Sequence, residues 1–219
     1  MSQIRKNTRF YNTTEWWIFC AGVFLSILLV GAAWYLYGSD PEKVQVFSLV
    51  FAVHTIGGRA AGIGLCIIND INNIWTIAYN FYLEILIVCF TYSISILSIN
   101  NYIKFRAVKY YSIRLERKAR KYKDKIEKYG WLGLFFFVMT PLPVTGPVVG
   151  SIIGSLLKFR ISKNFSATFT GTLAAIVAWT FFFDFLEEHL KVIRYILAVI
   201  IIIVLFSYAR DIKNLFNKD

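Results

Sequence analysis

The sequence predicts an all-α integral membrane protein with four spanning helices and two opposed re-entrant helical hairpins in an inverted repeat. Of its 219 residues, 57% are hydrophobic and only 17% are charged. The charges are clustered, which leaves long apolar stretches, and a run of about 18 apolar residues can cross a bilayer. The nearly uncharged stretches cover residues 16–38, 85–102, 129–157 and 195–209. Two hydrophobic segments, 44–68 and 130–157, are interrupted near their middle by glycine, proline or charge.

We expect one membrane domain over residues 1–219. Along the chain it contains spanning helix 16–37, hairpin 44–68, spanning helix 72–99, a basic cytoplasmic helix at 103–129, hairpin 130–157, and spanning helices 164–183 and 192–208.

The first segment has aromatic residues at both ends, as expected where a spanning helix meets the two membrane interfaces. It is too long for the apolar core of a signal peptide, so we expect it to be retained. These aromatic residues are Trp16, Trp17, Trp34, Tyr35 and Tyr37.

The two interrupted segments are predicted to be hairpins. The first is broken by His54 and by Gly57-Gly58-Arg59, and the second by the proline-rich run 141–147. Residues 131–140 and 148–157 each reach only about half of a ~30 Å hydrocarbon core at ~1.5 Å per residue. Two such half-helices joined by a tip enter and leave on one side.

The remaining elements follow from charge. The basic stretch 104–128 alternates cationic and aromatic residues at helical spacing, which favours an amphipathic helix on the membrane surface. If every segment crossed, this stretch would lie opposite the basic N-terminus, against the positive-inside bias. With both hairpins re-entrant, all basic clusters and both termini are cytoplasmic. The loop at 40–43 and an acidic loop with Asp184, Glu187 and Glu188 are then external.

Each hairpin is followed by a short polar turn (69–72 or 158–164) and a full span, so the two halves form an inverted-topology repeat. Such repeats place a binding site where the broken segments meet. The alternative is that any two hydrophobic hairpins look alike.

Helix N-termini at the two tips would favour an anion such as phosphate or carboxylate. Thr145 or Gly146 can cap the returning half-helix, and Gly58 and Arg59 form the first tip. The alternative is that the glycines and prolines only allow tight packing.

Ionisable residues inside the apolar segments are the next candidates, because such residues are costly in a membrane. Arg59 could bind substrate while Glu84 or Asp70 binds a proton or cation, or Arg59 and Glu84 could form a structural pair. His54 could relay a proton or be a hydrogen-bonded packing residue.

Other functions have little support. The basic stretch lacks a nucleic-acid recognition motif. The three cysteines, Cys20, Cys66 and Cys89, lie in apolar segments at unrelated spacings, so we expect neither disulfide nor metal cluster. No enzyme motif is present, and we predict a non-enzymatic protein, although an intramembrane hydrolase is not excluded.

A family resemblance rests on specific residues. The run 129–134, the run 141–146, and Gly150 and Gly154 resemble the signature of the putative small multidrug export family, grouped with the DedA and VTT-domain membrane proteins. Residues 59–64 and Asn80 add a weaker match. The resemblance implies opposed re-entrant hairpins and translocation of lipids such as polyprenyl phosphates, driven by an ion gradient. The family often has a glutamate at the position of Gly57, so that role would move to Glu84 or Asp70.

We therefore expect a flippase in the cell membrane for an anionic lipid, with no cofactor beyond H⁺ or Na⁺ coupling. Its partners would be membrane lipids, with no nucleic acid and with homo-oligomerisation left open. The alternatives are an exporter of hydrophobic compounds and a non-transporting scaffold. The predicted substrate-binding residues are Arg59, Gly58, Thr145, Gly146, Pro143 and Ser151, and the predicted ion-coupling residues are Glu84, Asp70 and His54.

Overall fold

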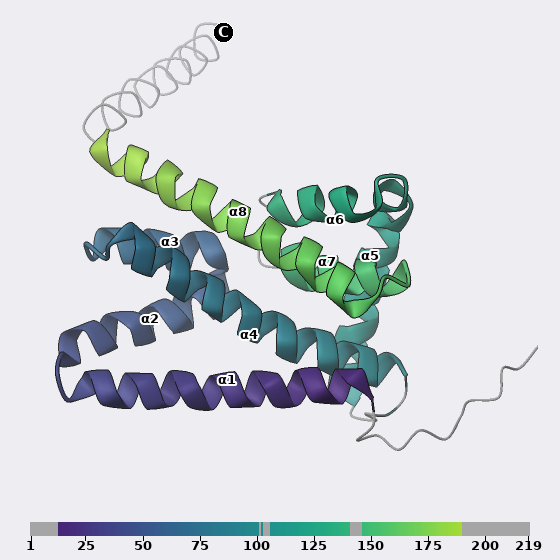
Figure 1. Ribbon diagram of the computed structural model, residues 1–219, viewed down its shortest axis with the longest axis horizontal. Helices are drawn as coiled ribbons and strands as arrows, with labels where there is room; N and C mark the ends of the chain where they lie inside the picture. Colours follow the sequence, from purple (N-terminus) through teal and green to yellow (C-terminus); the bar gives the residue numbers. More distant parts are fainter. Residues whose placement is uncertain (1–12, 101, 103–105, 141–145, 190–219) are drawn as a thin grey trace, which may run out of the picture. The chain divides into compact units, whose positions relative to one another are not determined.

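The computed structural model describes residues 13–100, 102, 106–140 and 146–189, and these described residues are helical apart from short connections (Figure 1). Residues 1–180 and 181–219 form two compact units, and the site lies in the first. The helices are α1 (Thr14–Tyr37), α2 (Pro41–Gly57), α3 (Arg59–Ile68), α4 (Asn73–Ile99), α5 (Arg106–Glu127), α6 (Gly130–Met139), α7 (Gly146–Leu156) and α8 (Ile161–Glu188).

Three of the described helices are long and apolar enough to cross a membrane: Thr14–Tyr37, Asn73–Ile99 and Ile161–Leu186. They correspond to three of the four predicted spans and support the prediction of a membrane protein. The fourth predicted span, residues 192–208, lies outside the described residues. Helix α4 is the central element, since it packs against α1, α2, α3, α5 and α7.

The first interrupted segment breaks at a single glycine. Helix α2 starts with Pro41 after the N-cap Asp40, whose carboxylate accepts a hydrogen bond from the Lys43 backbone N–H. The side-chain hydrogen bond from Lys43 lowers the pKa of the Asp40 carboxyl. The helix ends where Gly58 takes φ 82°, which a side chain would resist, and α3 then packs against α2.

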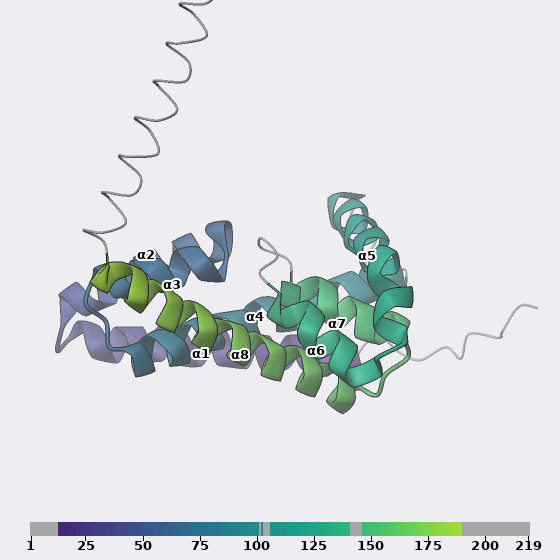
Figure 2. The ribbon, with the colours of Figure 1, turned by 90° about the horizontal axis from the view of Figure 1, so that it is seen from above.

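The second interrupted segment consists of two short helices, α6 and α7, that also pack against each other (Figure 2). Gly150 makes this contact close, because a Cβ there would lie 2.4 Å from Cγ2 of Val138. Gly171 of α8 serves the same purpose against the Phe135 carbonyl, where a Cβ would lie 2.6 Å from the oxygen. The two short helices of this segment, α6 and α7, are therefore closely packed against each other.

The two halves share a packing device. In the first, Asn80 of α4 faces Gly62 of α3, where an added Cβ would lie 2.6 Å from Oδ1 of Asn80. In the second, Asn164 of α8 faces Gly154 of α7, where an added Cβ would lie 2.1 Å from Oδ1 of Asn164. In each half, a buried asparagine on the long helix thus fits against a glycine of the preceding short helix.

The predicted amphipathic helix is α5, and its narrow apolar side, including Leu115, Ala119 and Ile126, is buried and packs on α4, α6 and α7. Two sequence predictions differ from the structure. The acidic loop predicted at 184–188 is helical and belongs to α8, since glutamate is a good helix former. Helix α8 also begins at Ile161, inside the predicted turn 158–164.

The asparagine–glycine contact in the second half gives a stability prediction. Gly154→Ala would force Asn164 away from the Ser151 carbonyl, to which its Nδ2 donates at 2.7 Å. Overpacking of this kind costs about 1–3 kcal/mol, so we expect a lower Tm in detergent.

The matched control is the same substitution at Gly31 of α1, where an added Cβ meets nothing within 4 Å. Gly31→Ala should raise stability by about 0.5–1 kcal/mol through helix propensity. Equal Tm values for the two variants would contradict the close contact at Gly154.

Candidate functional site

A cavity of about 390 Å³ lies in the first unit, where α1, α2, α4 and α5 meet the N-terminal ends of α3 and α7. Its walls are mostly apolar and include Phe51, Leu83, Leu86, Ile87 and Phe90. Three ionisable side chains of α2, α3 and α4 interrupt this apolar surface: His54, Arg59 and Glu84. Cavities of this kind, apolar with a few convergent polar groups, are the usual form of a small-molecule site.

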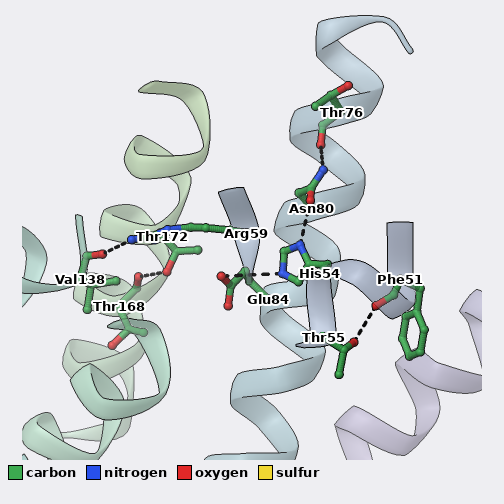
Figure 3. Close-up of polar contacts among 10 residues, drawn as sticks. All are labelled: Phe51, His54, Thr55, Arg59, Thr76, Asn80, Glu84, Val138, Thr168 and Thr172. Carbon is green, nitrogen blue, oxygen red and sulfur yellow. Dashed lines mark hydrogen bonds and ion pairs between the residues drawn. The ribbon is translucent and has the colours of Figure 1, made fainter. Parts of the chain in front are cut away.

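Arg59 links the two interrupted segments. It is the first residue of α3 and only 6% exposed. Its Nη2 donates to the Val138 carbonyl at 3.1 Å (Figure 3) and to the Thr140 carbonyl, also at 3.1 Å. These carbonyls belong to the C-terminal end of α6, where the last C=O groups of a helix have no partner within it. The other terminal nitrogen, Nη1, is buried and has no hydrogen-bond partner among the residues that the structure describes. Arg59 therefore holds α6 with one nitrogen and leaves the other available.

His54 is held from α4. Its Nδ1 lies 2.8 Å from Oδ1 of Asn80, whose Nδ2 donates to the Thr76 carbonyl at 2.8 Å (Figure 3). Gly62 makes room for this pair, because a Cβ there would lie 2.8 Å from Nδ1 of His54. The other ring nitrogen, Nε2, has no hydrogen-bond partner and lies 3.8 Å from Oε1 of Glu84.

Glu84 lies one helical turn after Asn80 on α4 and is 6% exposed. Among the described residues, the carboxylate of Glu84 lies nearest to the ring of His54, and no direct ion-pair contact joins it to Arg59. The sequence suggested Arg59 with Glu84 as a possible structural pair, and the two are not in direct contact. Arg59 instead bonds to helix-end carbonyls.

The N-terminal end of α7 completes the cavity. Gly146, Pro147 and Val148 line it, and a Cβ on Gly146 would lie 3.6 Å from Nη2 of Arg59. The N-terminal end of α7 thus lies in van der Waals range of the guanidinium. An α-helix N-terminus carries a partial positive charge and free N–H groups. This end of the cavity is therefore electropositive.

The predicted site residues divide into three groups. The structure brings Arg59, Gly58, Gly146, Glu84 and His54 to one cavity. It does not bring Asp70, which is exposed in the α3–α4 turn at φ 54°. Ser151 also lies away from the cavity lining, because it is buried in α7 with its hydroxyl donating to the Val148 carbonyl. Pro143 and Thr145 lie outside the described residues.

Sequence reasoning missed the role of Asn80 and the backbone acceptors of α6. Asn80 was part of a family-like motif only, although its spacing of four from Glu84 places both on one face of a helix. That spacing was a usable signal. The carbonyls of Val138 and Thr140 gave no signal in the sequence, since any residue supplies a backbone oxygen. The sequence also gave no signal that Tyr111 of α5 would line the cavity.

Comparison with known proteins gives one family. The family model described as "Putative small multi-drug export protein" matches residues 59–178, which is more than half of the chain. The match begins at Arg59 and includes Glu84 and all of α7, but not His54. No curated protein and no solved structure has significant similarity to the chain.

The Arg59 bridge gives a prediction about stability. Arg59→Met keeps an apolar stem but leaves the buried Val138 carbonyl and the partly buried Thr140 carbonyl without their donor, and an unsatisfied buried group costs about 1–3 kcal/mol. We expect a lower Tm and faster hydrogen exchange in α6.

Arg120→Met on the exposed face of α5 is the control, since its pair with Glu116 is an exposed i,i+4 pair worth at most about 1 kcal/mol. The bridge would be disproved if Arg59→Met changed α6 exchange no more than this control.

Proposed function

We propose a transport function for this chain, which belongs to the putative small multi-drug export protein family: it moves an anionic amphiphile across the membrane, with the charged head bound at Arg59. The observation that carries the proposal is the buried Nη1 of Arg59, which has no hydrogen-bond partner among the described residues and belongs to the lining of a mostly apolar cavity. A buried cationic donor without an acceptor is costly. An incoming phosphate or carboxylate oxygen would satisfy it.

The surroundings of Arg59 support an anion. The N-terminal ends of α3 and α7 both line the cavity, so two positive helix ends lie at the same place as the guanidinium. The guanidinium is a planar donor that suits phosphate and carboxylate geometry. The apolar wall formed by Leu83, Leu86 and Phe90 suits the adjoining part of a lipid-like molecule.

A more specific form of this proposal is a flippase for a polyprenyl phosphate. It rests on the resemblance of the hairpin motifs to the DedA and VTT-domain proteins and on the chemistry of a phosphate head with a long apolar chain. Glu84 and His54 would bind the coupling ion beside the head.

The proposed topology places both interrupted segments as re-entrant hairpins of the cell membrane, with the termini in the cytoplasm. The short lengths of α6 and α7, 10 and 11 residues, support this, because each reaches only half of the ~30 Å core. Broken backbone at that depth requires a protein or water-filled surrounding.

A second candidate is export of hydrophobic cations. Glu84 lines the cavity together with Phe51, Phe90 and Tyr111, and an acidic group among aromatic rings suits an organic cation. Arg59 disfavours this reading, since its positive charge is buried in the same small space.

Ligand binding separates the two candidates. We expect the purified protein in non-ionic detergent to bind dodecyl phosphate more tightly than dodecyltrimethylammonium. Arg59→Gln should weaken phosphate binding at least tenfold, about 1.4 kcal/mol, because it removes the charge. Arg120→Gln on the exposed face of α5 is the control and should bind as the wild type does.

Preference for the ammonium compound, with loss of its binding in Glu84→Gln, would instead establish the cation exporter. If neither compound binds, the transport proposal is wrong for both.

The topology has its own test. Single cysteines at Lys118 and Lys158, both exposed, should react with an impermeant thiol reagent from the same side of the membrane. A cysteine at Glu42 should react from the opposite side. The background is a variant with the three native cysteines replaced by alanine. Labelling of Lys118 and Lys158 positions from opposite sides would mean that the second interrupted segment crosses.

A further inference from the structure

The hydrogen bonds around His54 determine which of its nitrogens carries a proton. Asn80 Nδ2 donates to the Thr76 carbonyl at 2.8 Å, and a carbonyl can only accept. The amide is therefore oriented with its oxygen, Oδ1, toward Nδ1 of His54 at 2.8 Å. Since Oδ1 can only accept, Nδ1 must be the donor and carries a hydrogen.

The opposite nitrogen then has a free lone pair. In a neutral imidazole only one nitrogen bears hydrogen, so Nε2 is an acceptor. Among the described residues, Nε2 has no hydrogen-bond partner. It lies 3.8 Å from Oε1 of Glu84. This distance exceeds a hydrogen bond, as expected for two acceptors that repel each other. Together, Nε2 of His54 and Oε1 of Glu84 can share one proton.

We infer that His54 Nε2 and Glu84 form a proton-binding site, that Asn80 positions it, and that the proton and the anionic substrate bind together. Only the joint binding of proton and anion rests on the proposed anion function. A binding proton would bond to Nε2 or to Oε1 and draw the two groups to hydrogen-bond distance. The product is one imidazolium–carboxylate pair or its carboxylic acid–imidazole equivalent.

The charge of the cavity makes the two ligands cooperate. Beside His54 of α2, Arg59 of α3 and Glu84 of α4 are the charged groups among the described residues that line it. Tyr111 of α5 adds a phenol, and the described lining residues of α1 and α7 are not ionisable. With His54 neutral and Glu84 ionised, these charges sum to zero. One bound proton makes the sum positive, which attracts an anion. By reciprocity, a bound anion raises the affinity for the proton by the same factor.

The nature of the pair favours H⁺ over Na⁺. A hard cation takes oxygen ligands, whereas the atom opposite the Glu84 carboxylate is the ring nitrogen Nε2 of His54. The proposed transporter would therefore carry the anion and a proton in the same direction, as a symporter.

Histidine NMR tests the proton site without any ligand. The chain has two histidines, so the variant His189→Gln with ¹⁵N-labelled histidine reports on His54 alone. We expect the hydrogen on Nδ1 and a bare Nε2 at high pH, with protonation of Nε2 or its carboxylate partner on acidification. Glu84→Gln should shift this titration, and Asn80→Ala should populate the other tautomer. A hydrogen on Nε2 at high pH, or a titration that Glu84→Gln leaves unchanged, would overturn the site.

Ligand affinity tests the coupling. A dialkyl phosphate is a suitable probe because its charge stays at minus one across the range. Its affinity should fall up to tenfold per pH unit as the pair loses its proton, and Glu84→Gln and His54→Gln should each flatten this slope. A slope that persists in both variants would refute cotransport. If the probe does not bind at any pH while the NMR titration is as expected, the anion function fails and the proton site stands.

Discussion

The charge of Arg59 is the constraint on which the rest of the structure depends. A guanidinium that is 6% exposed inside an apolar protein must have acceptors. The chain provides them by ending α6 at a point where two of its terminal carbonyls face Arg59. A helix end is one of the few sources of free backbone acceptors at that depth. The helix end in the second segment therefore supplies hydrogen-bond acceptors to Arg59 of the first segment, and Arg59 supplies the donor that these carbonyls lack.

One glycine at this junction follows from the same constraint. Gly58 takes a positive φ so that α3 can begin at Arg59, and the N-terminal end of α7 at Gly146 lies close to the guanidinium. On the other side of the cavity, Gly62 admits the His54–Asn80 pair. Small residues thus bring the buried polar groups together. An Asn–Gly contact recurs in the second half, at Asn164 and Gly154, which suits two halves built on one plan.

Sequence reasoning could predict the parts that depend on length, charge and apolar pattern. The helix-breaking residues Gly57-Gly58 and the mid-segment charges Arg59 and Glu84 were visible, and so were the three described candidate spans. It could not predict that Arg59 would bond to carbonyls rather than to Glu84, because backbone oxygens are the same in every sequence. It also could not predict that Asp70 would lie outside the cavity lining, in an exposed turn with φ 54°. The helical continuation through 184–188 was missed because acidic residues suit both loops and helices.

The central claim is that the cavity selects an anionic head and carries it across the membrane. The most direct measurement is transbilayer movement in liposomes with reconstituted protein, followed for a labelled lipid phosphate and for its uncharged alcohol. We predict that the protein accelerates movement of the phosphate relative to protein-free liposomes, that Arg59→Gln abolishes this acceleration, and that movement of the alcohol is unaffected. Equal acceleration of both lipids, or full acceleration of the phosphate by Arg59→Gln, would contradict it.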